Sequence, residues 1–304
     1  MRRVHFIFAT TLIAAIASIM YEFVIAETTA AMAMNRIIWY SLIIGLFVGS
    51  LGLGSLWAGR RMDRSNRPAA LRLVQTEILL ACIGALAPLV ILLAHSAHIA
   101  LLVANATLSA YIVFPLAVML MTIAVGALSG RELPLLMSLV KEVSPQTHEV
   151  VFARALGFDY VGSLIGALVF VLIAYPLLAT METAAVVAIA NMILVWCILY
   201  VYREQLSKHA PTLFFSIAST VLVATLLGAT PVLERHFLDR YYFYEQYAGD
   251  LRSFFHVTDV RGDVERYRSP YQTIDLVTDP AQARDRELLA AYSDRWLAQP
   301  PVPN

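Results

Sequence analysis

The chain has 304 residues, of which 59% are hydrophobic and 14% are charged, against about 25% charged residues in a typical soluble domain. Lys+Arg and Asp+Glu number 22 each, so the formal net charge is zero and offers no basic surface for nucleic acid. This composition excludes an ordinary soluble protein and a disordered chain, and it predicts a polytopic membrane protein.

Seven stretches are long and apolar enough to cross a bilayer, which takes roughly 20 residues per helix. The predicted fold class is therefore all-α: a bundle of about seven transmembrane helices followed by a short extramembrane tail. The nearly uncharged segment 95–108 leaves the count open, because it either extends a neighbouring span, lies at the surface or forms part of an eighth span. The predicted spans are 5–26, 37–59, 72–94, 106–129, 155–178, 183–202 and 211–229.

Basic residues gather in alternate loops, which is the pattern that orients membrane proteins with these loops in the cytoplasm. The pattern predicts a bacterial inner-membrane protein with a cytoplasmic N-terminus and, after seven spans, a periplasmic tail. An eighth span would reverse the side of the tail. The loop residues are Arg2, Arg3, Arg60, Arg61, Arg64, Arg67, Arg72, Arg131, Lys141, Arg154, Arg203 and Lys208.

Charge density divides the chain into two parts. Residues 1–230 carry 23 charged residues and residues 231–304, a quarter of the length, carry 21. We therefore predict a transmembrane helical domain at 1–230 and an extramembrane tail at 231–304.

Glycines recur at four-residue spacing in three of the predicted spans. Small residues at this spacing let helices approach closely in lipid. The spacing fits packing within the bundle and equally fits a docking face for another membrane subunit. The predicted packing residues are Gly45, Gly49, Gly54, Gly126, Gly130, Gly162 and Gly166.

Ionisable residues at membrane depth are the strongest functional signal, because a charge in hydrocarbon needs a cavity, a partner or water. By the predicted topology Glu22 lies near the outer leaflet and the others near the inner one, so a single compact site does not follow from topology. Anchoring at the interface and mutual pairing are the structural alternative. The candidate polar residues are Glu22, Arg131, Glu132, Arg154, Asp159 and Tyr160.

The tail combines aromatic residues, a strand pattern and a polar segment. The strand pattern at 257–277 predicts a β-hairpin that turns at 260–263. The polar segment 281–297 is predicted to form one helix. Tyrosines here either anchor the bundle at the headgroups or bind a partner protein. The candidate partner-binding residues are Tyr241, Tyr244, Tyr267 and Tyr271.

Four membrane motifs, in order and spacing, resemble the membrane domain fused to some bacterial spermidine synthases, which are aminopropyltransferases. The tail segment YRSPYQTIDL at 267–276 resembles the strand that opens the catalytic domain of that family. The motifs are MYE at 20–22, IGLFVGSLGLGS at 44–55, GRELPLL at 130–136 and DYVGSLIGAL at 159–168.

The resemblance stops where a nucleotide-binding fold would have to follow. The 33 residues after Tyr271 contain no glycine, whereas such a fold needs a glycine-rich turn and more than 30 residues for one βαβ unit. We therefore expect no catalytic domain in this sequence, no catalytic residue, no metal and no cofactor, and an enzymatic role is less expected than a non-enzymatic one.

Three hypotheses about function remain at this point. The first is a non-catalytic membrane subunit or scaffold that associates with a synthase-like domain, another membrane complex or a second copy of itself. The second is a transporter or binding protein for a small cationic, polyamine-like solute. The third is the membrane half of a split aminopropyltransferase-like enzyme.

Overall fold

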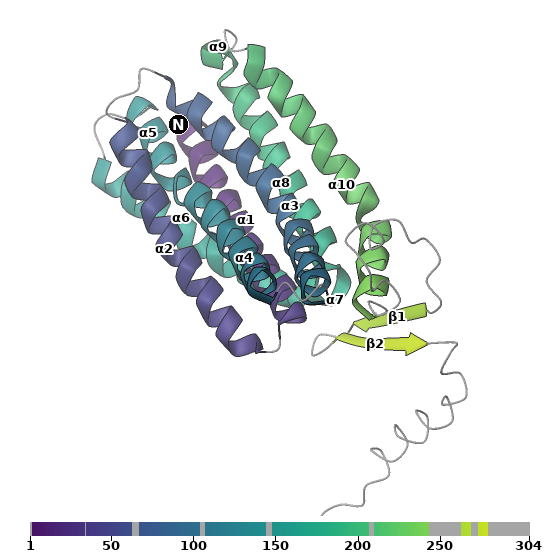
Figure 1. Ribbon diagram of the computed structural model, residues 1–304. Coiled ribbons are helices and arrows are strands. Elements are labelled where there is room, and N and C mark those ends of the chain that lie inside the picture. The colour runs from purple at the N-terminus through teal and green to yellow at the C-terminus, as the bar shows by residue number, and fades with distance from the viewer. Residues whose placement is uncertain are drawn as a thin grey trace, which may run out of the picture.

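The structure is a computed structural model that describes residues 2–33, 35–62, 67–103, 107–143, 148–206, 210–242, 263–268 and 273–278. Its helices form one bundle, and two strands lie beside the end of the last helix (Figure 1). Seven spans are long and apolar enough to cross a membrane, which confirms the predicted fold class. The helices are α1 (Arg2–Met32), α2 (Arg36–Met62), α3 (Ala69–Val103), α4 (Thr107–Ser129), α5 (Glu132–Val143), α6 (His148–Val169), the π-helical turn η1 (Phe170–Ala174), α7 (Tyr175–Leu177), α8 (Thr180–Val201), α9 (Arg203–Leu206) and α10 (Ala210–Tyr242).

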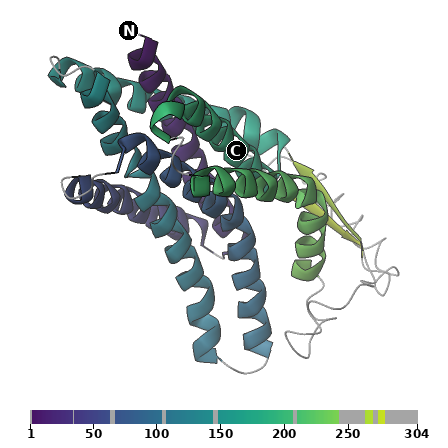
Figure 2. The ribbon, with the colours of Figure 1, turned by 90° about the horizontal axis from the view of Figure 1, so that it is seen from above.

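Segment 95–108 belongs to the third and fourth spans. Helix α3 continues to Val103 and α4 begins at Thr107, and the two helices run side by side (Figure 2). Each contains one proline, Pro88 in α3 and Pro115 in α4, within a continuous helix. The described residues therefore hold seven candidate spans, with none added in this segment.

Three helices form the interior of the bundle and three form its periphery. Half of the most apolar window of α1, α3 and α8 is buried, whereas α2, α6 and α10 bury only 22%, 17% and 22% of theirs. The large side chains of Tyr21, Leu80 and Met192 lie in this interior. Because lipid tails favour apolar surface, the peripheral helices can present apolar side chains outward at no hydrophobic cost.

Helix α10 extends past the predicted domain boundary at residue 230. It continues through Pro231 to Tyr242, and the apolar span itself reaches Leu238. Proline in a helix leaves one carbonyl without its usual donor; the hydroxyl of Thr230 donates to the Leu227 carbonyl at 2.8 Å in this turn. The expected division between bundle and tail thus falls inside a helix.

The tail forms the predicted hairpin, but with a different turn. Strands β1 (Asp263–Arg268) and β2 (Thr273–Thr278) pair antiparallel, with Asp263 opposite Thr278. The predicted turn at 260–263 is therefore wrong, because Asp263 already belongs to the ladder and residues 269–272 connect the strands. The predicted polar helix at 281–297 lies outside the described residues.

The beginning of α1 and the hairpin lie at opposite ends of the bundle (Figure 1). An odd number of crossings requires this arrangement. The hairpin sits by the C-terminal end of α10, near the link from α1 to α2.

Candidate functional site

A cavity of about 380 Å³ lies between α1, α2, α5 and α6. Glu22 of α1, Glu132 of α5 and Asp159 of α6 line it, so three of the six predicted polar residues share one cavity. Its volume is within the range of about 300–1,000 Å³ that small-molecule sites occupy. The rest of the wall combines hydroxyl groups with apolar surface, including Thr11, Ser18, Ser163, Phe47, Leu133 and Leu136.

Glu22 lies deeper than the sequence suggested. The first span runs from Val4 to Met32, six residues beyond the predicted end at residue 26. Glu22 is therefore more than two turns from the end of the helix, and only 4% of its surface is exposed. Glu22 therefore lines the same cavity as Glu132 and Asp159, although the three do not form one compact cluster.

Asp159 reaches the cavity because α6 packs tightly on α1. A Cβ added to Gly162 would lie 2.5 Å from the carbonyl oxygen of Leu12, so only glycine permits this approach. One helical turn before Gly162, the ring of Phe158 stacks on that of Phe8 with centroids 5.2 Å apart. These contacts place Asp159 beside the first half of α1.

The cavity is elongated along α1. Its wall includes residues of α1 from Thr11 to Glu22, a distance of about 16 Å at the helical rise of 1.5 Å per residue. Asp159 lies beside the beginning of this stretch and Glu22 marks its end. The carboxylates are therefore spread along the cavity.

Glu132 is positioned by a break between α4 and α5. Helix α4 ends at Ser129, and α5 begins at Glu132 after Gly130 and Arg131. A Cβ on Gly130 would lie 2.1 Å from the carbonyl oxygen of Leu51, so the backbone of α2 lies directly against the break. Glu132 occupies the first turn of α5, where a negative charge is favoured by the helix dipole.

Two polar groups of the cavity have no hydrogen-bond partner among the described residues. The Oε1 atom of Glu132 and the hydroxyl of Ser129 are buried and have no hydrogen-bond partner. Among the described residues no basic side chain forms an ion pair with Glu22, Glu132 or Asp159. Buried polar groups in proteins are almost always paired, so unpaired ones that line a cavity indicate a ligand site.

Glu77 and Tyr21 lie next to Glu132 but are absent from the set of polar residues predicted from the sequence. Glu77 of α3 is 0% exposed and Tyr21 of α1 is 1% exposed, and both are electrostatic neighbours of Glu132. Both oxygens of Glu77 and the hydroxyl of Tyr21 are buried without a hydrogen-bond partner. The sequence signal for Glu77 was available, since it is a carboxylate within an apolar span.

The other three candidate residues do not line the cavity. The guanidinium of Arg131 lies 4.6 Å from the centroid of the Trp57 ring, in the geometry of a cation–π contact. Arg154 is exposed, and Tyr160 is 66% exposed. The predicted polar set thus divides into three carboxylates in the cavity and three residues outside it.

The predicted packing glycines also divide into two groups. At Gly54, Gly126, Gly130, Gly162 and Gly166, an added Cβ would come within 3.0 Å of a neighbouring helix. At Gly45 and Gly49 the same Cβ would meet nothing within 4 Å. The first group lies in helix contacts of the bundle, and the α2 face with Gly45 and Gly49 is uncovered.

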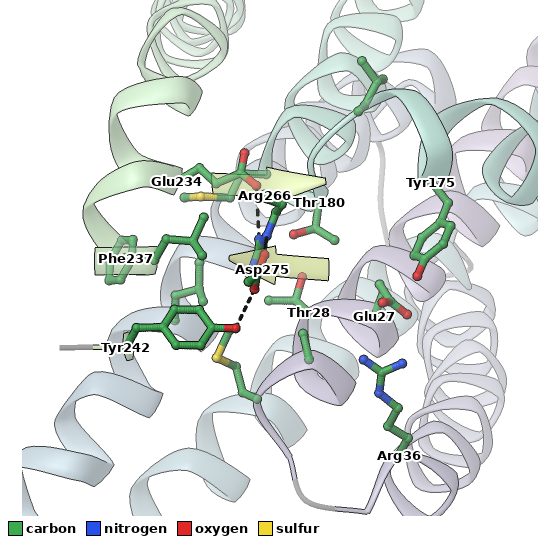
Figure 3. Close-up of a pocket in the computed structure, with 16 residues that line it drawn as sticks. Glu27, Thr28, Arg36, Tyr175, Thr180, Glu234, Phe237, Tyr242, Arg266 and Asp275 are labelled. Carbon is green, nitrogen blue, oxygen red and sulfur yellow. Dashed lines mark hydrogen bonds and ion pairs between the residues drawn. The ribbon is translucent and has the colours of Figure 1, made fainter. Parts of the chain in front are cut away.

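A second cavity, of about 220 Å³, lies where the hairpin meets the bundle. Figure 3 shows Arg266 and Asp275 of the hairpin beside Glu234 and Tyr242 of α10, with Glu27 and Arg36 across the cavity. Arg266 Nε donates to Asp275 at 2.7 Å, and the Tyr242 hydroxyl donates to the same carboxylate at 2.6 Å. Arg266 also pairs with Glu234 at 3.4 Å.

The carboxylate of Asp275 keeps the guanidinium of Arg266 charged. Burial lowers the pKa of Arg266, but the hydrogen bond and charge of Asp275 outweigh this and hold the pKa above its ordinary value. The guanidinium therefore stays charged at every physiological pH.

Of the predicted partner-binding tyrosines, only the side chain of Tyr267 is described. It is 55% exposed, and its hydroxyl donates to Glu265 at 2.9 Å. This hydrogen bond raises the pKa of Tyr267. Tyr244 and Tyr271, and the side chain of Tyr241, lie outside the described residues.

Comparisons with known proteins give one consistent class of relatives. Polyamine aminopropyltransferase 1 of Streptomyces coelicolor is 29% identical over 216 residues, which are 71% of this chain and 37% of that protein. Polyamine aminopropyltransferases of Oceanobacillus iheyensis and Corynebacterium efficiens are 26% and 28% identical, over 67% and 69% of this chain and 37% and 40% of their own length. No family model and no solved structure matches the chain.

These matches establish a distant similarity to polyamine aminopropyltransferases. The chain spans less than half the length of these curated relatives. Together with the seven candidate spans, the similarity describes a multi-pass membrane region related to theirs.

Proposed function

We propose that the transmembrane domain binds a linear aliphatic polyamine lengthwise in the cavity between α1, α2, α5 and α6. The observation that carries the proposal is the set of three carboxylates, Glu22, Glu132 and Asp159, that line one elongated cavity without a basic partner. A bound cation would supply the missing countercharge.

The spacing of the carboxylates favours an extended organic cation over a metal ion. In the part of the chain that the structure describes, no group of three or more potential ligand residues could hold a metal ion. A polyamine carries ammonium groups separated by methylene segments. Its ammonium groups suit the carboxylates of Glu22, Glu132 and Asp159, which line an elongated cavity, and its methylene groups suit apolar wall residues such as Phe47 and Leu133.

The relatives support the choice of ligand class. Their names specify polyamines, and the similarity covers about 70% of this chain. We propose the same ligand class for the cavity of this chain.

Substitution of the cavity carboxylates tests the proposal. Spermidine binding to the purified chain would be measured by isothermal titration calorimetry for Glu22→Gln, Glu132→Gln and Asp159→Asn. Each change removes one charged contact and should weaken binding roughly 10- to 100-fold, since a hydrogen bond to a charged group contributes about 1.5–3 kcal/mol.

Glu142→Gln is the matched control, because Glu142 lies on α5 with Glu132 but is exposed and outside the cavity. It should bind spermidine like the wild type. Absence of binding by the wild-type chain, or equal affinity in all four variants, would refute the proposed function. Tighter binding of Mg²⁺ than of spermidine would also refute it.

The scaffold hypothesis has weaker structural support. Its best feature is the uncovered face of α2 with Gly45 and Gly49. Nothing described in the structure indicates whether lipid or protein covers that face.

A further inference from the structure

We propose that Glu77 and Glu132 form a proton-exchange pair, so that a cation entering the cavity displaces a proton from the pair. This inference rests on the proposed function, because it specifies how the same cavity responds to a cation. It starts from Glu77, a buried carboxylate that contributes no surface to the cavity.

The two carboxyl groups occupy different positions relative to the cavity. Glu132 of α5 lines the cavity, whereas Glu77 of α3 is fully buried next to Glu132. The unpartnered oxygens on both residues are acceptor sites that a proton shared between the two carboxyls would satisfy. The pair therefore connects the cavity wall to the interior of the bundle.

No positive charge compensates the pair in the described residues. The titratable groups that interact with the pair are Tyr21 of α1 and Asp159 of α6, neither of them basic. The guanidinium of Arg131, directly before Glu132, lies 4.6 Å from the centroid of the Trp57 ring and forms no ion pair with either carboxylate. Arg72 lies five residues before Glu77 on α3 and forms no ion pair with either carboxylate.

The remaining helices that pack on α3 bring no basic group to this level. Helix α4 has no charged residue, and the charged residue of α8 is Glu182 in its first turn. The charged residues of α10 all follow Pro231. Arg203 of α9 forms no ion pair with Glu77 or Glu132.

Elementary electrostatics then assigns the protons. Two adjacent carboxylates in hydrocarbon cannot both remain ionised without a cation, so the empty pair holds protons. When an ammonium group contacts Glu132, the ionised carboxylate is stabilised and its proton leaves to solvent. The exchange is balanced: one proton is released for one positive charge that the pair accepts.

Proton counting during spermidine binding tests the inference. Calorimetry between pH 5.5 and 7.5, in buffers of different ionisation enthalpy, gives the number of protons released by the purified chain. Spermidine is almost completely protonated in this range, so nearly all released protons come from the protein. We expect release of about one proton per spermidine and, by linkage, an affinity that rises about tenfold per pH unit.

Two variants locate the source of the proton. The double variant Glu77→Gln with Glu132→Gln should lose the proton release and the pH dependence, with residual binding through Glu22 and Asp159. Glu22→Gln is the control, and it should bind more weakly while still releasing the proton. Thermal unfolding of both variants verifies that they are folded.

The outcomes separate this inference from the proposed function. Wild-type binding without proton release would overturn the inference alone. Proton release by the double variant equal to that of the wild type would also overturn it, because the proton would then come from Glu22 or Asp159. No spermidine binding at any pH would overturn the proposed function and the inference together.

Discussion

At the scale of single residues, two glycines of α2 lie in opposite environments. A Cβ added to Gly54 would lie 2.1 Å from the carbonyl oxygen of Ala127 in α4, while one added to Gly49 would meet nothing within 4 Å. Both residues belong to one helix and one run of glycines. Alanine substitutions at these two positions can therefore distinguish the effect of a helix contact on stability from the effect of helix propensity.

Gly54→Ala should destabilise the bundle, because α2 and α4 would have to move apart. Overpacking of this kind costs about 1–3 kcal/mol. Thermal unfolding in detergent micelles, followed by circular dichroism, would report the loss as a lower midpoint.

Gly49→Ala is the comparison variant for this measurement. It has the same change in helix propensity and no clash, so its midpoint should equal or exceed that of the wild type. Equal destabilisation by both substitutions would contradict the α2–α4 contact.

The sequence identified the individual carboxylates but not their meeting. Glu22, Glu132 and Asp159 stand out because a charged residue interrupts an apolar run, which is a local signal. Their convergence depends on which helices touch. Gly162 is needed at the α1–α6 contact because the backbone of α1 lies directly opposite it, and the sequence of α6 does not show which helix lies there. Arg131 gives the same local signal and points instead to Trp57.

At the scale of elements, the hairpin depends on α10. A two-stranded hairpin is marginal alone in water, and β1 and β2 form a sheet of only two strands. The contacts that hold it pass through Asp275, which accepts hydrogen bonds from Arg266 and from Tyr242 of α10. Asp275 therefore contributes two of the contacts that hold the hairpin, and the Arg266–Glu234 pair contributes another.

Asp275→Asn should release the hairpin from α10. It removes the closer of the two charges that pair with the partly buried guanidinium of Arg266 and leaves only Glu234 at 3.4 Å. Hydrogen exchange measured by mass spectrometry should show at least tenfold faster exchange over residues 273–278, with unchanged protection of the transmembrane helices.

Tyr267→Phe is the control for the hairpin. It removes an exposed hydrogen bond to Glu265 within β1 and should leave hydrogen exchange over 273–278 as in the wild type. If Asp275→Asn behaved in the same way, the strand pair would be stable without α10.

Helix ends were harder to predict than helix existence. Apolar length identified seven spans, because the bilayer thickness imposes it. It gave no information on α10 beyond residue 229, where the helix continues through Glu234 and Arg235 to Tyr242. The predicted end of the fourth span at residue 129 agrees with the end of α4 at Ser129, whereas the helix α5 that follows at Glu132–Val143 was not predicted.

At the scale of the whole molecule, the seven spans separate the two ends of the bundle. The hairpin lies at the end opposite the start of α1 (Figure 1), and α5 ends on the side where α1 begins. With the N-terminus cytoplasmic, as the basic loops predict, the hairpin faces the periplasm.

Single cysteines would test this orientation in intact cells. Tyr267→Cys on the hairpin should react with a membrane-impermeant thiol reagent, while Glu142→Cys at the end of α5 should react only after permeabilisation. Both positions are exposed, so the bilayer and not burial decides the result. The reverse pattern would invert the topology, and labelling of the chain without either cysteine would measure the background from Cys82 and Cys197.

The π-helical turn η1 sets the angular phase of the fifth span. In a regular α-helix, Asp159 and Tyr175 would point about 160° apart, since each residue turns the helix by about 100°. The π-turn takes up one additional residue, which reduces that angle to about 60°. Asp159 in the larger cavity and Tyr175 in the smaller one therefore project from the same side of one helical column. A one-residue deletion within 170–174 that restores a regular α-helix should keep both side chains on this side, because fifteen steps of about 100° give the same angle of about 60°.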